Sequence, residues 1–290
     1  MSNASPKPAT GDPEKQPYGA HAPTGFVARA IGWTRGAGRG WLGKKTVAVL
    51  RLLALRSLAG KPVDMETLGA RMRLQPHNNL CDKRILFTPQ HYDAEERAHL
   101  ASFISGHATA PEPLRFVDIG ANVGVYSLYV ANLAGNGARI LAIEPHPDIF
   151  ARLTANIGFN PFGTIKAVAV AVADKPGELT MFLDPRNKGE SSVRFLRSGT
   201  AETIKVPATS LVRLLADEGY DRIDALKIDV EGAEDLILEP FFRLAPESLW
   251  PTLVVLVDST SRWHVDLRTL LVDKGYRELA HTRDNFVFLR

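Results

Sequence analysis

Two glycines and an acidic residue near the middle of the chain have the spacing of a nucleotide-binding turn. The apolar run 114–119 leads directly into Gly120 and Gly124, and a helical pattern follows at once. Glycines let a backbone turn tightly and approach a ligand at a helix N-terminus. A second apolar run ends in Glu144, 24 residues after Gly120, where a carboxylate can hold the two hydroxyls of a ribose. These residues predict a nucleoside-cofactor site at the edge of an α/β sheet.

The spacing of the glycines bears on which cofactor this is. The dinucleotide fingerprint is G-x-G-x-x-G, whereas this chain has G-x-x-x-G preceded by Asp118. S-adenosylmethionine has no pyrophosphate and instead carries an ammonium and a carboxylate. Asp118 suits the ammonium, and the backbone N–H groups of the turn, with Asn122, suit the carboxylate. The turn therefore favours a methyltransferase, while an NAD-linked oxidoreductase remains the alternative enzyme and a non-catalytic cofactor-binding partner protein the alternative outside enzymes.

A second block of acidic residues lies at 225–234, where a buried strand ends in acids and Gly232 precedes a helix. Ligands in open α/β sheets lie outside the carboxyl ends of the strands. Asp229 and Glu231 are therefore expected at the same sheet edge as Asp118 and Glu144.

With both blocks in view, the chain resembles the FkbM family of S-adenosylmethionine-dependent methyltransferases over roughly residues 65–290. The matching stretches are 117–124, 126–128, Glu144-Pro145, Asn156, Ser191-Ser192, Val206-Pro207 and 226–234. The resemblance implies a Rossmann-like class I methyltransferase fold and methyl transfer to hydroxyl groups of sugars, glycans or polyketides. The chain departs from the family pattern at Leu211-Val212, where Leu-Asp is frequent, and at Asp258, where Glu is frequent. These departures concern the acceptor more than the cofactor.

Methyl transfer to a hydroxyl requires alignment of the acceptor oxygen and removal of its proton. We assign catalysis to Asp229 and Glu231, and Asp229 is the first candidate for the base because it ends a central strand. Asp229 could instead hold the methionine ammonium or cap the next helix, and Glu231 could stabilise the start of that helix. His146 and His264 are further candidate bases.

The remaining site assignments follow from the same sheet edge. For the cofactor we predict contacts with Asp118, Gly120, Asn122, Gly124, Glu144 and Asp174. For the acceptor, a sugar, glycan or other small molecule, we predict contacts with Ser191, Ser192 and His264, although the two serines could equally lie in a plain surface loop. We expect no metal ion. The alternative is Mg²⁺ held by Asp229 and Asp258 at the ends of neighbouring strands, with no third ligand visible in the sequence.

Composition limits the class of protein. The net charge is only +3, which does not indicate a nucleic-acid partner. The single cysteine, Cys81, excludes an internal disulfide and a cysteine-based zinc site. The sequence contains no run of 18 apolar residues, so we expect no membrane-spanning helix. Residues 1–24 lack the apolar core of a signal peptide. We therefore expect a cytoplasmic protein.

The charge is unevenly distributed, because residues 26–61 contain eight Lys and Arg and no acid. This stretch is predicted to be helical, with a break at 36–40 and a leucine-rich second half. One interpretation is a helix that docks on the catalytic domain or on a second subunit of a homodimer. The other is a basic amphipathic helix that lies on the inner face of the membrane as a peripheral contact.

The chain divides into a disordered tail at 1–25, the basic helical extension at 26–61, a β element and a helix at 62–110, and a catalytic domain at 111–290. The β element is expected at 68–74 and 84–87, and the helix at 93–106. Within the catalytic domain, strands are predicted at 114–119, 138–144, 164–173, 177–183, 202–207, 223–229, 252–258, 276–281 and 285–290, and helices at 123–134, 147–158, 209–218, 233–243 and 262–274. The alternation implies a mostly parallel sheet, closed by an antiparallel C-terminal hairpin.

Overall fold

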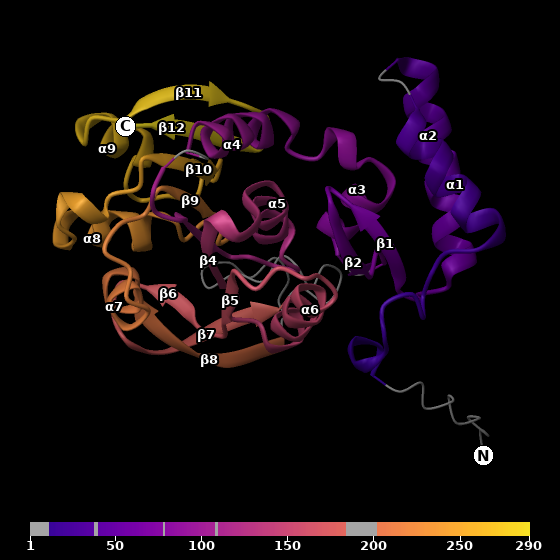
Figure 1. Cartoon of the computed structure of the whole chain (residues 1–290), viewed down its shortest axis with the longest axis horizontal. Helices are drawn as coiled ribbons and strands as arrows, with labels where there is room; N and C mark the ends of the chain where they lie inside the picture. The colour runs from indigo at the N-terminus through magenta and orange to yellow at the C-terminus, as the bar shows by residue number, and fades with distance from the viewer. Residues whose placement is uncertain (1–11, 38–39, 78, 108–109, 184–201) are drawn as a thin grey trace.

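The computed structural model describes residues 12–37, 40–77, 79–107, 110–183 and 202–290. Its centre is a seven-stranded sheet in the order β11-β12-β10-β9-β3-β4-β5 (Figure 1). The strands are β3 (Leu114–Ile119), β4 (Ala138–Ile143), β5 (Ile165–Val168), β9 (Ala225–Ile228), β10 (Leu253–Val257), β11 (Arg277–His281) and β12 (Asn285–Leu289). All neighbours pair in parallel except β12, which is antiparallel to both β10 and β11. The predicted class I methyltransferase fold, with its antiparallel C-terminal strand, is confirmed.

The strand order reverses between β3 and β9. From β3 the chain adds β4 and β5 on one side, and it later adds β9 and β10 on the other. In open α/β sheets such a reversal opens a crevice outside the carboxyl ends of the two strands, where ligands bind. The residues that directly follow β3 and β9 are Gly120 and Asp229, so both sequence motifs converge on this crevice.

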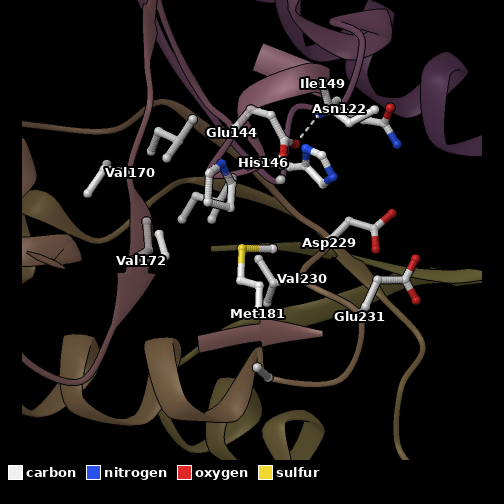
Figure 2. Close-up of a pocket in the computed structure, with 16 residues that line it drawn as sticks. Asn122, Glu144, His146, Ile149, Val170, Val172, Met181, Asp229, Val230 and Glu231 are labelled. Atoms are coloured by element: carbon white, nitrogen blue, oxygen red, sulfur yellow. Dashed lines mark hydrogen bonds between the residues drawn. The ribbon is translucent and has the colours of Figure 1, made fainter. Parts of the chain in front are cut away.

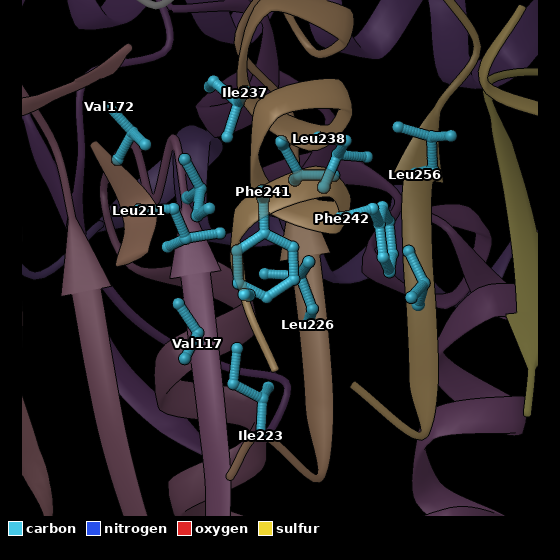
Figure 3. Packing of buried hydrophobic residues seen from close by; sticks show 14 of the residues in the cluster. Val117, Val172, Leu211, Ile223, Leu226, Ile237, Leu238, Phe241, Phe242 and Leu256 are labelled. Carbon is cyan, nitrogen blue, oxygen red and sulfur yellow. The ribbon is translucent and has the colours of Figure 1, made fainter. Parts of the chain in front are cut away.

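Helices cover both faces of the sheet because its parallel strands are apolar on both sides. One face carries α4 (Ala94–His107), α5 (Val125–Ala134) and α6 (Pro147–Gly158), and the other carries α7 (Leu211–Asp217), α8 (Asp235–Leu244) and α9 (Leu267–Asp273). Figure 3 shows Phe241 and Phe242 of α8 packing over Leu226 and Leu256 of the sheet. Short 3₁₀ turns lie at η1 (Pro13–Lys15), η2 (Pro89–His91), η3 (Gly135–Gly137) and η4 (Glu247–Leu249).

The single strand predicted at 164–173 is wrong, because the chain leaves the main sheet after β5. It then forms β6 (Ala171–Ala173), which belongs to a separate three-stranded sheet with β7 (Gly177–Leu183) and β8 (Glu202–Ser210). β6 pairs in parallel with β8, and β7 pairs antiparallel with it. Residues 167–173 are all Ala or Val, and such a run cannot show where the chain passes from one sheet to another. The split brings Val170, Val172 and Met181 to the crevice.

The N-terminal extension consists of α1 (Gly25–Gly36), α2 (Trp41–Leu58), β1 (Val63–Thr67), β2 (Ala70–Leu74) and α3 (Leu80–Phe87). The predicted break between two helices is confirmed, and β1 and β2 form an antiparallel pair. The strand predicted at 84–87 is wrong, because these residues end α3, whose first turn is capped by Asn79 Oδ1 accepting from Asp82 N at 3.1 Å. Within the described ranges, no helix has the length and the apolar character needed to cross a bilayer.

Part of the tail that we predicted to be disordered has a defined course in the structure. Asp64, buried in β1, accepts hydrogen bonds from the backbone N–H groups of Gly19 and His21 at 2.8 and 3.0 Å. Asp64 also forms an ion pair with the buried Arg73, whose Nε lies 2.7 Å from Asp64 Oδ1. Arg73 donates further hydrogen bonds to the carbonyl oxygens of Gln16 and Pro17. This buried ion pair supplies partners to the backbone of residues 16–21, which composition alone did not reveal.

Candidate cofactor and methyl-transfer site

The turn after β3 is packed against the end of β9. Gly120 has φ +76°, and a Cβ placed on it would lie 1.9 Å from the carbonyl oxygen of Asp229. The backbone N–H groups of Gly120 and Ala121 both donate to the carbonyl oxygen of Ile143, at 3.0 and 2.9 Å. Glycine is therefore required at position 120 first of all by the close approach of two chain segments at the strand-order reversal.

Asn122 continues this turn with φ +50°, a left-handed conformation that Asn adopts more readily than most residues. Its side-chain oxygen accepts a hydrogen bond from Asn79 Nδ2 at 3.0 Å, so the N-terminal extension contacts the turn directly. Gly124, at φ +91°, packs on α6, because a Cβ there would meet Leu153 Cδ1 at 2.8 Å. Gly124 thus shapes the entry into α5 and is not among the residues that line the pocket.

Glu144 follows β4 directly and is buried, with 7% of its surface exposed. Oε2 accepts from Asn122 N at 3.0 Å and Oε1 accepts from His146 N at 2.9 Å. A carboxylate has about four acceptor positions, so each oxygen keeps capacity for a further donor. Burial raises the pKa of Glu144 to about 7, against the lowering effect of the two backbone hydrogen bonds.

The crevice forms a pocket with polar ends and an apolar wall (Figure 2). Asn122, Glu144 and His146 lie at one end, and Asp229 and Glu231 lie across from them. The apolar part of the lining is formed by Ile119, Ile143, Pro145, Ile149, Val170, Ala171, Val172, Met181, Val230 and Ala233. Such a pocket suits a ligand that has a flat apolar ring to lie against the wall and charged or hydroxyl groups to reach the polar ends. The apolar residues of 170–181 were not predicted from the sequence as site residues.

His146 has a structural role beside its place in the lining. Its Nδ1 accepts from the backbone N–H of Asp148 at 3.1 Å and so caps the start of α6. The residue is buried. Because its Nδ1 serves as a helix cap, His146 is a weaker candidate for the base than Asp229.

Asp229 is the acidic side chain that reaches from β9 toward the pocket. Its side chain is 40% exposed, and its Oδ2 lies 3.4 Å from Lys227 Nζ. Lys227 is buried, and its Nζ lies 5.4 Å from the centre of the Tyr126 ring. A buried ammonium therefore stands behind a carboxylate that is open to a ligand. The importance of Lys227 was not recognised from the sequence, although its position two residues before Asp229 in a strand places both side chains on the same face.

Glu231 and Glu234 fix the loop after Asp229 in different ways. Glu231 has φ +56°, and Arg262 Nη1 contacts both its carbonyl oxygen, at 3.1 Å, and its Oε2, at 3.6 Å. Glu234 is fully buried and accepts from Val230 N, Gly232 N and Trp263 Nε1 at 2.9, 3.0 and 2.7 Å. Burial raises the pKa of Glu234, and these hydrogen bonds oppose the shift. Glu231 thus lines the pocket, while Glu234 shapes the loop from behind.

Besides Gly124, three predicted cofactor or acceptor residues lie away from this lining in the described part of the chain. Asp118 is buried beneath α5, where its Oδ2 accepts from Ser127 N and Ser127 Oγ at 3.1 and 2.6 Å. Burial raises the pKa of Asp118 to about 6, while the Ser127 hydrogen bonds and Lys227 lower it. Asp174 follows β6 and is exposed. His264 donates its backbone N–H to Asp235 Oδ2 at 2.7 Å.

Two further sequence assignments need correction or lie outside the structure. The helix predicted from 262 begins at Leu267, because Asp266 Oδ1 accepts from Arg268 N and Thr269 N and caps it there. His264 therefore precedes the helix instead of opening it. The predicted acceptor contacts Ser191 and Ser192 lie outside the described residues.

Asp258, the second residue of the Mg²⁺ alternative, has another partner. Its Oδ2 lies 3.0 Å from His281 Nε2. Burial raises its pKa, but hydrogen bonds from His281 and Thr260 outweigh that effect and leave it below the usual value. Among the described residues there is no group of three or more His, Cys, Asp and Glu placed to hold a metal ion.

Comparison with known sequences agrees with this geometry. The sequence model of the methyltransferase FkbM domain matches residues 118–278. Methyltransferase sdnD of Sordaria araneosa is 30% identical over 201 residues, covering 58% of this chain and 76% of that protein. Hexuronic acid methyltransferase AglP of Haloferax volcanii is 29% identical over 123 residues, covering 42% of this chain and 47% of that protein. The solved METTL16 methyltransferase domain is 16% identical, covers 92% of this chain and 91% of its own, and has a TM-score of 0.48.

Proposed function

This chain belongs to the FkbM family of S-adenosylmethionine-dependent methyltransferases, and on that premise we propose that it transfers the methyl group to a hydroxyl of a sugar, glycan or related metabolite. The observation that carries the proposal is the pairing of two carboxylates across one pocket. Glu144 is buried and fixed at one end, and Asp229 is partly exposed at the other. The family match also removes the reason to prefer an NAD-linked oxidoreductase.

The residues present fit the cofactor. Glu144, fixed by two backbone N–H groups, has acceptor capacity left for the two ribose hydroxyls. Val170, Val172 and Met181 offer an apolar wall to the adenine ring. The methionine end of the cofactor would lie toward Gly120 and Asn122, which line the pocket. The backbone N–H groups of Gly120, Ala121 and Asn122 already donate within the protein, so they give no support to the carboxylate contact expected from the sequence.

The bound cofactor would supply a methyl group activated by a positively charged sulfur, and the sulfur would leave as a neutral thioether when the hydroxyl oxygen bonds to the methyl carbon. Holding the acceptor oxygen in line can supply on the order of 7–11 kcal/mol of the barrier. Asp229 would accept the hydroxyl proton at its carboxylate, and Lys227 behind it would keep that carboxylate oriented toward the pocket. A base of this kind contributes roughly 10²–10⁴-fold to the rate. If Asp229 instead holds the methionine ammonium, Glu231 is the carboxylate left for the proton.

The acceptor class is supported by two observations of different kinds. The relative from Haloferax volcanii is named a hexuronic acid methyltransferase, and a hexuronic acid is a sugar-derived acceptor. The partly exposed carboxylates Asp229 and Glu231 line the pocket, and methyl transfer to a neutral hydroxyl would need a proton acceptor of this kind. The fold by itself does not determine the acceptor, so oxygen as the methylated atom rests on these two points.

The test of acceptor class is a comparison of glycans and small metabolites from cells that contain and lack the protein. A species 14 Da heavier that disappears on deletion is expected, and it should return with the wild-type protein but not with Asp229→Asn. Feeding methionine with a labelled methyl group identifies the added carbon. A non-catalytic partner protein would instead bind S-adenosylmethionine and leave every labelled product unchanged.

A further inference from the structure

The outer face of the hairpin formed by α1 and α2 exposes an unusual amount of apolar surface. Trp33 and Trp41 are 71% and 67% exposed. The other large apolar side chains exposed on these helices are Phe26, Val49, Leu52 and Leu53. In a soluble protein, large exposed apolar side chains are normally scattered singly. Here six belong to one hairpin, which Figure 1 shows at one end of the molecule.

The fold does not need this outer face, because the hairpin is anchored by its inner face. Val27, Ile31, Ala54 and Leu58 are buried in the core of the N-terminal extension. Arg35 adds polar anchorage by donating to the carbonyl oxygen of Leu86 at 2.9 Å and to that of Glu66 at 3.0 Å. The hairpin therefore docks on the rest of the chain, as one of the two interpretations of the sequence proposed, and its outer face is left uncovered.

The exposed apolar side chains of α2 form a stripe that includes cations. Trp41, Lys45, Val49, Leu52 and Arg56 follow one another at intervals of three or four residues, which places them on one side of a helix. Lys45 and Arg56 are exposed, and Lys45 Nζ lies 3.9 Å from the centre of the Trp41 ring. Trp and Lys with these neighbours are typical of helices that lie at a membrane interface.

Electrostatics decides what kind of surface fits this face. Residues 25–61 contain eight Lys and Arg and no acid, and of these Arg29, Lys45, Arg56 and Lys61 are exposed. A second copy of the chain that paired symmetrically through this face would bring cations against cations with no acid of the hairpin to neutralise them. An anionic surface meets the opposite condition. We infer that the outer face of the α1–α2 hairpin binds an anionic lipid membrane, with its aromatic and leucine side chains entering the interface.

Membrane binding through this face would also fix the position of the pocket. Arg35 joins the hairpin to the end of α3, and Asn79 at the start of α3 contacts Asn122 beside Glu144. The contacts between the hairpin and the pocket thus pass through one short helix, α3. An acceptor carried on a lipid would be presented to the pocket at a constant height.

The test is co-sedimentation of the full chain with phosphatidylcholine vesicles that contain or lack phosphatidylserine, an anionic lipid of the cytoplasmic leaflet. We expect binding only to the anionic vesicles, and release as salt is raised. Trp33→Ser/Trp41→Ser/Leu52→Ser should abolish it. The matched control Leu133→Ser/Leu244→Ser/Val272→Ser removes three apolar side chains of 42%, 61% and 56% exposure elsewhere and should bind like wild type.

A second variant keeps the test decisive if the first fails to fold. Arg29→Gln/Lys45→Gln/Arg56→Gln should lower partitioning into anionic vesicles about 100-fold, since each cation near such a surface contributes roughly five-fold. Binding of S-adenosylmethionine should be unchanged in every variant, so the outcome does not depend on the proposed function. Three results would overturn the inference: no binding to anionic vesicles, equal binding by wild type and both hairpin variants, or a dimer in sedimentation velocity that the Trp33→Ser/Trp41→Ser/Leu52→Ser variant converts to monomer.

Discussion

The backbone N–H of Asn122 donates to Oε2 of Glu144 over 3.0 Å, which ties the turn after β3 to the end of β4. A second backbone donor, His146 N, holds Oε1 at 2.9 Å. The Glu144 carboxylate is therefore oriented by the fold alone, before any ligand arrives. A preoriented group loses little further freedom on binding, which favours affinity.

The protonation of Glu144 leads to a prediction about pH. Burial raises its pKa to about 7, so the carboxyl is mostly neutral at pH 6 and mostly charged at pH 8. The charged form accepts from two ribose hydroxyls better than the neutral form does. Affinity for S-adenosylmethionine should therefore rise ~10-fold from pH 6 to pH 8, measured by calorimetry. Glu144→Gln should bind weakly at every pH. If the affinity of that variant rose with pH as steeply as that of the wild type, the pH dependence would belong to another group, such as Asp118, whose pKa is raised to about 6.

Gly120 gives a prediction about stability. Gly120→Ala should lower the free energy of unfolding by at least ~2 kcal/mol, because a left-handed alanine alone costs roughly 1–2 kcal/mol and its Cβ would overlap the Asp229 carbonyl oxygen. Gly158→Ala is the matched control, since nothing lies within 4 Å of a Cβ there and the residue is in α6. Thermal unfolding of both variants is the measurement. A Gly120→Ala protein with the melting temperature of the wild type would contradict the close approach of Gly120 to the Asp229 carbonyl oxygen.

Asp229→Asn separates the two roles of that residue. If Asp229 accepts the proton, turnover should fall ~10²-fold or more while affinity for S-adenosylmethionine stays nearly constant. If it holds the methionine ammonium, affinity falls instead. Calorimetry and initial rates on one preparation distinguish these results, and Asp258→Asn, which is paired with His281, serves as a control carboxylate. Normal rates and normal affinity together would remove Asp229 from the site.

Metal dependence is tested by chelation. Asp229 pairs with Lys227 and Asp258 with His281, so these two carboxylates already have charged or hydrogen-bonding partners. We expect methyl transfer to proceed at its full rate after dialysis against EDTA. A loss of activity that added Mg²⁺ restores would show that the acceptor is held through a metal ion.

Much of the fold was predictable because local signals agreed with it. The strand β3 at Leu114–Ile119 and the helix α6 at Pro147–Gly158 have the predicted bounds. In the first, a run of apolar residues ends at a glycine, and in the second a proline opens an amphipathic pattern. The antiparallel pairing of β11 with β12 followed from the short connection between them.

The errors occurred where a local pattern had two solutions. Ile85 and Phe87 have β propensity, but the cap at Asn79 commits them to α3. The stretch 167–173 contains only Ala and Val, so nothing local marks the passage of the chain from one sheet to another. Tertiary partners decide both cases, and those partners are distant in sequence.

The site shows the same division. Glu144, Asp229 and Gly120 were predictable because a strand-end position fixes their place at the sheet edge. Asp118 has the same kind of position, yet its side chain turns under α5 to Ser127. Strand position alone does not say which face a terminal side chain takes when a hydroxyl partner is available. Lys227 was missed because a lysine inside an apolar strand shows no partner until the strand is placed beside Tyr126.

The most direct measurement is the titration of the wild-type chain and of Glu144→Ala with S-adenosylmethionine and with NAD. The wild type should bind S-adenosylmethionine at one site per chain and should not bind NAD. Glu144→Ala should lose about 1.5–3 kcal/mol of that binding free energy, the scale of charge-assisted hydrogen bonds to a ligand. Binding of NAD in place of S-adenosylmethionine, or wild-type affinity for S-adenosylmethionine in Glu144→Ala, would contradict the assignment of this pocket.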